Sequence, residues 1–219
     1  MTMDRRHSVV TRWWWIRHAP VTVNDGRIYG RTDLPCDTDD AAGFSGLAAI
    51  LPRDAAWVVS DLMRTHQTAA AIVRAGLPGP ERFPGDGVIV EPDLAEQDFG
   101  EWHGKTYSWL AEHRAEQYHR FWHAPAHERA PGGESFEDLL ARVSIVIDRL
   151  NVELAGRDII AVAHGGTIRS AIAKALDLAP ETALAFAADN ISLTRLDHFR
   201  GGSDIGHSWR VSCLNRPPA

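Results

Sequence analysis

The feature that most constrains the fold is a set of four apolar runs of strand length, each followed directly by polar residues. They cover residues 9–16, 56–59, 88–90 and 159–163. Nearly continuous apolar strands indicate burial on both faces of a sheet. Segments with the apolar spacing of helices lie between and after them, at 43–51, 62–75, 136–154 and 167–176. The alternation predicts an α/β fold, a three-layer α/β/α sandwich with a mostly parallel central sheet. Two further runs, at 192–196 and 207–214, predict a hairpin at one edge of that sheet.

Length and composition indicate one domain. A chain of 219 residues with 44% hydrophobic content can bury a sizeable core, and this length is usual for a single domain. We therefore expect one domain over residues 1–219. The stretch of about 98–133 differs, because aromatic and histidine residues crowd into short helical pieces interrupted by Pro125, Pro131 and two glycines. We expect it to form a small helical cap inserted over the sheet.

Charge and cysteine content exclude several classes of protein. The formal net charge of -6 and the lack of a Lys/Arg-dense run argue against a nucleic-acid-binding face. Cys36 and Cys213 are the only cysteines, which excludes a disulfide framework and fits a reducing cytoplasm. The apolar stretch near the N-terminus is short and is interrupted by Arg12, so it reads as a strand and not as a signal peptide or membrane span. We expect a cytoplasmic protein that binds neither nucleic acid nor membrane.

Residues whose side chains can take part in catalysis or anion binding follow the four apolar runs. In open α/β sheets, ligands bind in the crevice beyond the carboxyl ends of the strands. The residues found at these ends are, in chain order, Arg17, His18, Ser60, Asp61, Arg64, Glu96, His164, Gly165 and Gly166. They supply two guanidiniums, two imidazoles, carboxylates and a glycine-rich helix start whose free amides suit an anion.

This set suits phosphoryl transfer without a metal, which needs cations around the equatorial oxygens, an in-line nucleophile and a proton donor for the leaving oxygen. Arg17 and Arg64 can donate paired hydrogen bonds to phosphate oxygens, and His164 would add a third cation if protonated. Neutral His18 can attack phosphorus through one ring nitrogen while a backbone carbonyl orients the other. Glu96 can protonate the departing alkoxide and later deprotonate the attacking water.

Five blocks of residues resemble, in this order, the histidine phosphatase (phosphoglycerate-mutase-like) superfamily. They are residues 17–19, 60–69, 94–104, 131–135 and 162–169, and they cover roughly residues 13–176. The resemblance implies that His18 becomes phosphohistidine and that Glu96 is the proton donor. It implies that Arg17, Arg64 and His164 line a phosphate pocket. From the set of residues itself we expect that neither a cofactor nor a metal is needed. Asn24 sits where the family often places a phosphate-contacting asparagine.

One departure from the family pattern lies beside the nucleophile. The first block usually has glycine after the histidine, whereas this chain has Ala19 and then Pro20. Alanine reaches positive φ only at a cost, and proline removes an amide donor. We expect Ala19 to keep negative φ and His18 to stay competent, with local phosphate contacts that differ.

The segment after the acid block resembles the phosphatase branch of the family and lacks the longer segment of the mutases. Residues 26–35 and 121–125 are similar to α-ribazole-phosphatase-like members. We therefore predict a phosphomonoester hydrolase for a small phosphorylated metabolite, with phosphoglycerate-mutase-type transfer as the alternative and a homodimer left open. The candidates for the substrate side of the pocket, each with packing as the alternative role, are Arg27, Tyr29, Trp102 and His103.

Three histidines of the cap raise a different alternative, a metal-dependent hydrolase. His119, His123 and His127 are four residues apart, the spacing that places ligands on one face of a helix. Pro125 lies between the second and third of them, which argues against a continuous helix. No Asp-rich ligand set accompanies them, so we expect no metal site.

Overall fold

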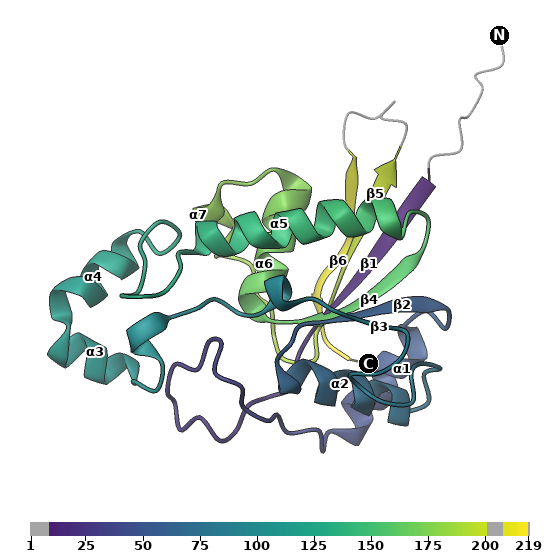
Figure 1. Ribbon diagram of the computed structural model, residues 1–219, viewed down its shortest axis with the longest axis horizontal. Coiled ribbons are helices and arrows are strands. Elements are labelled where there is room, and N and C mark those ends of the chain that lie inside the picture. Colours follow the sequence, from purple (N-terminus) through teal and green to yellow (C-terminus); the bar gives the residue numbers. More distant parts are fainter. Residues whose placement is uncertain (1–8, 201–207, 219) are drawn as a thin grey trace, which may run out of the picture.

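The computed structural model describes residues 9–200 and 208–218, and its centre is a six-stranded sheet in the order β3-β2-β4-β1-β5-β6 (Figure 1). The strands are β1 (Val9–Arg17), β2 (Ala55–Val59), β3 (Val88–Val90), β4 (Asp158–Ala163), β5 (Leu193–Arg200) and β6 (Trp209–Arg216). The first four pair in parallel, and β5 pairs antiparallel with both β1 and β6. The predicted hairpin therefore lies at one edge of a mostly parallel sheet. His207, where its second run was expected to begin, and residues 1–8 lie outside the described residues.

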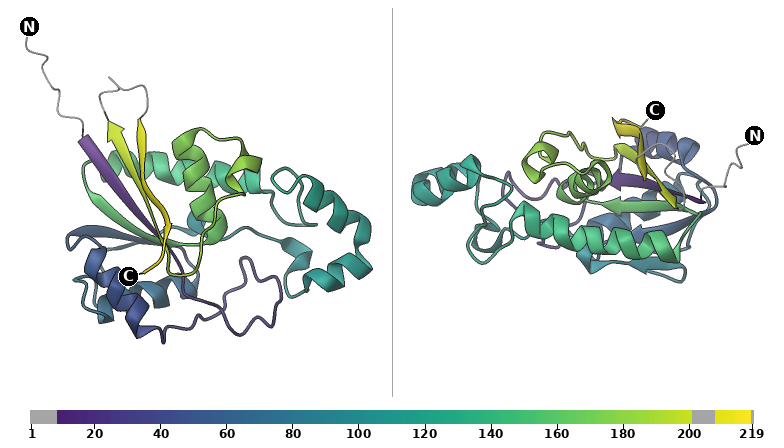
Figure 2. Two further views of the ribbon diagram at one scale, coloured as in Figure 1. Left: turned by 180° about the vertical axis from the view of Figure 1, so that it is seen from behind. Right: turned by 90° about the horizontal axis from the view of Figure 1, so that it is seen from above.

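Helices cover both faces of this sheet, and Figure 2 shows the layers from two further directions. The helices are α1 (Ala41–Ile50), α2 (Met63–Arg74), α3 (Tyr107–His113), α4 (Ala115–His123), α5 (Phe136–Glu153), α6 (Gly165–Leu176) and α7 (Pro180–Ala183), with short 3₁₀ turns at η1 (Pro92–Leu94) and η2 (Gly100–Trp102). One apolar cluster joins α1 and α2 to Ile16 and Val162, and another joins α5 and α6 to Trp13 and Trp15. Successive strand residues thus point to opposite faces of the sheet and contribute to two separate cores. This confirms the predicted three-layer fold class.

Helix α5 shows how the sequence specifies one of these layers. Ser135 caps the helix by accepting a hydrogen bond from the backbone of Asp138, whose side chain bonds back to the Ser135 amide. Leu139, Val143 and Leu150 are fully buried against the sheet. Burial of each such side chain stabilises the fold by about 1.5–3 kcal/mol relative to exposure.

Helices α3 and α4 stand away from the sheet at one end of the molecule (Figures 1 and 2). Their apolar side chains form a separate cluster of buried residues that includes Trp102, Leu110 and Phe121, together with Ile28 from the loop after β1. The stretch expected to be a cap therefore folds around a core of its own. Within the described parts of the chain, no helix is long and apolar enough to cross a membrane.

Candidate active site

The ring of His18 is held immediately after β1 in a single tautomer. His18 is only 1% exposed, and its Nδ1 lies 2.7 Å from the carbonyl oxygen of Ala19. That carbonyl can only accept, so Nδ1 carries the proton and Nε2 keeps a free lone pair. Burial, reinforced by the charge of Arg64, lowers the pKa of His18 to about 3. The ring is therefore neutral at physiological pH, as a nucleophile must be.

The backbone around His18 is tied from two directions despite the missing glycine. Ala19 does not have positive φ, as predicted, and its amide donates to Oγ1 of Thr68 on α2 at 2.9 Å. From the other side, Nδ2 of Asn190 donates to the carbonyl oxygen of His18 at 2.7 Å. The amide of Asp37 donates to the carbonyl oxygen of Pro20 at 2.7 Å. These bonds hold the nucleophile loop without glycine.

The segment that carries Asn190 is itself strained. Ile191 has a φ of 52°, a left-handed conformation that costs a β-branched residue on the order of 1–3 kcal/mol. Its amide donates to the carbonyl oxygen of Arg17 at 3.0 Å. The surrounding structure thus enforces an unfavourable backbone at a point that supports both Arg17 and His18. The sequence offered no signal for this role.

Two arginines supply positive charge beside His18. Nη1 of Arg17 donates to the carbonyl oxygen of Ala188 at 2.6 Å, whereas its Nε is buried without a partner. The Arg64 side chain is fully buried, and its two terminal nitrogens donate to the carbonyl oxygens of Gly30 and Thr32. A buried N–H without a partner is costly unless a ligand satisfies it, so Arg17 Nε suits an incoming oxyanion.

His164 follows β4 and packs between these groups. Its Nε2 lies 2.8 Å from Oγ of Ser60, its Nδ1 accepts from Nε of Arg64 at 3.3 Å, and its ring centroid is 5.2 Å from that of His18. Burial, followed by the charge of Arg64, holds the pKa of His164 well below its usual range. His164 is therefore neutral and is not a third cation here, since it cannot be protonated cheaply when buried beside a guanidinium. It positions Arg64.

The carboxylate of Glu96 sits at the first turn of α6. Its Oε1 accepts from the amides of Gln97 at 3.0 Å and of Gly166, at the start of that helix, at 3.1 Å. Arg142 of α5 secures the same loop by donating to the carbonyl oxygens of Ala95 and Glu96 at 2.9 and 3.0 Å. The predicted acid–base is thus placed by two helices.

Sequence reasoning missed Arg142, although a signal was present. Arg142 pairs with Glu134 at 2.5 Å, and it falls between the apolar positions Leu139 and Val143 of an amphipathic helix. A charged residue that close to a buried face generally has a partner. The partner itself could not be read from the sequence.

These groups border a hollow of about 400 Å³ at the carboxyl ends of the parallel strands, which we call the strand-end hollow. Its lining includes Arg17, Asn24, Arg27, Tyr29, Glu96, Tyr107, Gly166 and Arg169. His18 and Arg64 are buried beside it, with the Tyr29 ring 6.5 Å from the His18 ring and 5.2 Å from Arg64 Cζ. The fold therefore gathers the five residues predicted to be catalytic, together with Asn24, Arg27, Tyr29 and Gly165. Tyr107 and Arg169 had not been predicted.

Two predicted substrate residues lie elsewhere. Trp102 is 3% exposed and packs in the cap with its ring centroid 5.0 Å from that of Phe121. Nε2 of His103 accepts from the amide of Phe99 at 3.1 Å. Neither Trp102 nor His103 lines the strand-end hollow, because the cap uses both to build its own core and turn.

The cap histidines are separated in the same way. Helix α4 ends at His123, two residues before Pro125, and His119 and His123 are exposed on it. Nδ1 of His127 lies 2.8 Å from Oε1 of Glu137 instead. Over residues 9–200 and 208–218, the structure contains no group of three or more His, Cys, Asp or Glu side chains placed to hold a metal ion. The geometry of these donors gives no support to the metal-dependent alternative.

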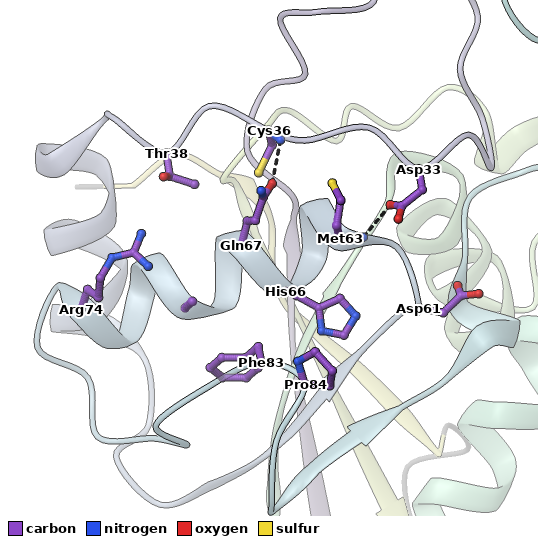
Figure 3. Close-up of a pocket in the computed structure, with 11 residues that line it drawn as sticks. Asp33, Cys36, Thr38, Asp61, Met63, His66, Gln67, Arg74, Phe83 and Pro84 are labelled. Atoms are coloured by element: carbon purple, nitrogen blue, oxygen red, sulfur yellow. Dashed lines mark hydrogen bonds between the residues drawn. The ribbon is translucent and has the colours of Figure 1, made fainter.

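A second hollow, of about 570 Å³, lies on the outer side of α2 (Figure 3). Met63 and His66 of that helix face it, and the amide of Met63 donates to Oδ1 of Asp33 at 2.7 Å across its rim. None of the five predicted catalytic residues lines it. Helix α2 therefore turns Arg64 towards the strand ends and a different set of side chains towards this hollow.

Arginines and a neutral histidine converge at the strand ends of an α/β sheet that helices cover on both faces, an arrangement suited to a phosphoryl group. The profile of the histidine phosphatase superfamily (branch 1) matches residues 13–209, and the chain belongs to that superfamily. The family predicted from the sequence, and with it the assignment to an enzyme family of phosphatases, is confirmed.

Individual relatives agree with this assignment. The bifunctional protein Rv2228c of Mycobacterium tuberculosis is 32% identical over 204 residues, which are 88% of this chain and 52% of the relative. The chain thus spans about half the length of that relative. The metal-independent phosphoserine phosphatase of Arabidopsis thaliana is 29% identical over 95% of this chain and 88% of its own. The crystal structure of the alpha-ribazole phosphatase from Shigella flexneri superposes with a TM-score of 0.75 over 93% of this chain and 96% of that one, at 24% identity, and shares the fold.

Proposed function

We propose that this protein is a phosphomonoester hydrolase that works through a phosphohistidine at His18. The observation that carries the proposal is the tautomer of His18, which is neutral and keeps Nε2 free beside two guanidiniums. Membership of the histidine phosphatase superfamily supports it. If His18 had only a structural role, the buried Nε of Arg17, which has no hydrogen-bond partner, would be left unexplained.

The first half-reaction forms the phosphoenzyme. Substrate oxygens accept hydrogen bonds from Arg17 and, after it releases a backbone carbonyl, from Arg64. Nε2 of His18 attacks phosphorus, the bond to the ester oxygen breaks, and protonated Glu96 gives its proton to that oxygen. The positive charge that develops on the ring is shared with the Nδ1–H, whose acceptor is the Ala19 carbonyl oxygen.

The second half-reaction releases phosphate. Glu96, now ionised, removes a proton from water as the water oxygen attacks phosphorus, and the bond from phosphorus to Nε2 breaks. His18 returns to its neutral form and Glu96 is protonated again, so protons and electron pairs balance over the cycle. The bonds from Gly166 and Gln97 keep the Glu96 carboxylate in place through both steps.

The substrate is proposed to be a small phosphorylated metabolite, and the reaction to need no metal. A hollow of about 400 Å³ falls in the size range of small-molecule sites, and the charge that a metal would supply is present in Arg17 and Arg64. The name of the Arabidopsis relative supports metal independence. Two free thiols, Cys36 and Cys213, support a reducing cytoplasm as the place of action.

The test is to trap the intermediate. Incubation with a ³²P-labelled phosphomonoester is expected to give an acid-labile phosphoenzyme, which a His18→Ala variant does not form. A His127→Ala variant, which removes an exposed histidine of the cap, is the matched control and should be labelled like the native protein. Equal labelling of His18→Ala would overturn the assignment of the nucleophile.

The same preparation separates the alternatives. Hydrolysis predicts that label leaves the enzyme as inorganic phosphate, whereas mutase-type transfer predicts labelled phosphoglycerate when glycerate acceptors are supplied. Activity should survive exhaustive chelation by EDTA. Loss of activity that zinc or manganese restores would contradict metal independence.

A further inference from the structure

Arg169 lies beside the phosphoryl site, yet the mechanism above does not use it. It lines the strand-end hollow from α6, and its Nε donates to the carbonyl oxygen of Phe186 at 2.8 Å. A Cβ atom built on Gly165 would lie 3.3 Å from Nη1 of Arg169 and 3.6 Å from Nε of Arg17. The two guanidiniums therefore approach the same point, the glycine at the start of α6.

The charges around the hollow do not balance against a phosphate alone. Within the described part of the chain, none of the ion pairs involves Arg17, Arg27, Arg64 or Arg169. Glu96 is the carboxylate among the lining residues. A phosphate monoester carries between about −1.5 and −2 charges at neutral pH. The two positive charges of Arg17 and Arg64 balance that phosphate. The remaining two positive charges, on Arg27 and Arg169, face a single carboxylate, Glu96.

We propose that Arg169 binds a second anionic group of the substrate, a carboxylate or a second phosphate. The inference rests on the proposed function and narrows its substrate class to phosphate esters that carry another negative charge. Arg169 is suited to this because the Phe186 carbonyl fixes its Nε and leaves its terminal nitrogens for a planar anion. Arg27, which is exposed at the rim and anchored to Gly104, adds to the positive field.

The organic part of such a substrate has a defined place. Tyr29 and Tyr107 line the same hollow as Arg169, and Tyr107 is 48% exposed. Their rings offer apolar contact together with a hydroxyl group. Arg169 and Arg17 both approach Gly165, so two anionic groups bound by them would lie close together. A short carbon chain between the two groups fits that arrangement.

The first experiment compares matched substrate pairs on the native protein. The pairs are 3-phosphoglycerate with glycerol 3-phosphate, phosphoglycolate with ethyl phosphate, and fructose 1,6-bisphosphate with fructose 6-phosphate. Carboxylate and phosphate sources of the second charge are thereby tested separately. In at least one pair, kcat/KM should be about tenfold or more higher for the member with the second charge. If no pair shows the preference, the inference is overturned.

The second experiment assigns the preference to Arg169. An Arg169→Gln variant should lose about 10- to 100-fold in kcat/KM on the preferred anionic substrate, while its matched partner stays within about threefold. Arg169→Lys should keep part of the preference because it keeps the charge. The control is Arg74→Gln, which removes an exposed arginine at the end of α2 and should change neither substrate.

The alternative roles of Arg169 give different results. If its guanidinium contacts the transferred phosphoryl group, or only ties down Phe186, Arg169→Gln will lower kcat/KM equally for both members of a pair, which overturns the inference. Should Arg169→Gln fail to fold, the same comparison with Arg169→Lys and the native substrate preference decide. Equal hydrolysis of all esters leaves the proposed function intact and overturns this inference alone. If no ester is hydrolysed and no phosphoenzyme forms, both fail.

Discussion

At the scale of single residues, one hydrogen bond leaves Nε2 of His18 free for the proposed attack on phosphorus. The Ala19 carbonyl oxygen holds the proton on Nδ1, and burial beside Arg64 keeps a second proton off the ring. The orientation of that carbonyl depends on the peptide group before it, because Thr68 and Asn190 both hold the peptide group that joins His18 to Ala19. Nucleophile and support therefore come from three distant parts of the chain.

Asn190 is predicted to be a positioning residue. Its amide nitrogen satisfies the His18 carbonyl oxygen at 2.7 Å, and leaving such a group without a partner costs on the order of 1–3 kcal/mol. We expect Asn190→Ala, and the isosteric Asn190→Asp, to lower kcat for nitrophenyl phosphate by about 10- to 100-fold. KM should stay within about threefold, since Arg17 and Arg64, the proposed phosphate ligands, remain.

Steady-state kinetics with both variants would check this, with thermal unfolding to confirm that each is folded. The Asp variant keeps the shape but replaces the amide donor by a carboxylate, which when ionised only accepts and adds a negative charge, and the Ala variant removes the donor without adding charge. A normal kcat for Asn190→Asp, or a rise in KM alone, would show that the contact does not position the nucleophile.

At the scale of elements, the start of α6 holds Glu96, the proposed acid–base. The N-cap residue His164 makes no capping hydrogen bond with its own side chain, so the first amides of α6 remain for other acceptors. The Glu96 carboxylate accepts from the amide of Gly166 at 3.1 Å. The backbone can approach that closely only because residue 166 lacks a side chain. A Cβ there would meet Oε1 of Glu96 and lie 2.7 Å from Cδ2 of Leu139.

A Gly166→Ala substitution is predicted to displace Glu96 without removing it. The variant should lose about tenfold or more in kcat on alkyl phosphates, whose leaving oxygen needs a proton, and clearly less on nitrophenyl phosphate. Glu96→Gln should show the same dependence on the leaving group, with larger losses. A Gly166→Ala variant that loses equal activity on both kinds of substrate would refute this role for the helix start.

At the scale of the whole molecule, the sheet separates two apolar cores, and the cap carries a third. The site lies where β1 and β4 end between these cores, and the packing of the cores therefore buries its two histidines. His18 and His164 are 1% and 0% exposed. Such burial disfavours the protonated form of both rings, so protonation favours the unfolded chain.

Global stability is therefore predicted to fall on acidification. The unfolded chain binds a proton at His18 below its ordinary pKa of 6.5, whereas the folded chain does not until about 3. In this window the unfolded state holds more protons, so the free energy of unfolding rises with pH and is lost as pH falls. The shift of His18 should remove about 2 kcal/mol between pH 7 and pH 5, and His164 acts in the same direction.

Urea unfolding at pH 7 and pH 5 measures this effect. A His18→Gln variant should lose about 2 kcal/mol less stability than the native protein over that interval, since the carboxylates that titrate below pH 5 are common to both. Parallel pH dependence in the two proteins would show that His18 is not held neutral by the fold.

The sequence by itself determined the class of fold and the end of the sheet at which the candidate catalytic residues gather. Buried strands need apolar runs, and ligands bind where parallel strands end, so Arg17, His18, Glu96 and His164 could be identified from their positions alone. The cap could also be located, because its prolines and glycines interrupt the pattern of the sheet.

Only the tertiary structure decided how those groups are charged and held. The neutral state of His164 depends on its burial against Arg64, 100 residues away in the chain. The roles of Asn190, Arg142 and Arg169 depend on contacts with backbone atoms, which every residue carries and no sequence pattern marks. Trp102 was placed at the substrate pocket wrongly, because the local sequence does not distinguish a tryptophan that binds a ligand from one that packs in a core. Desolvation and backbone contact are properties of three-dimensional neighbours, and they exist only once the chain has folded.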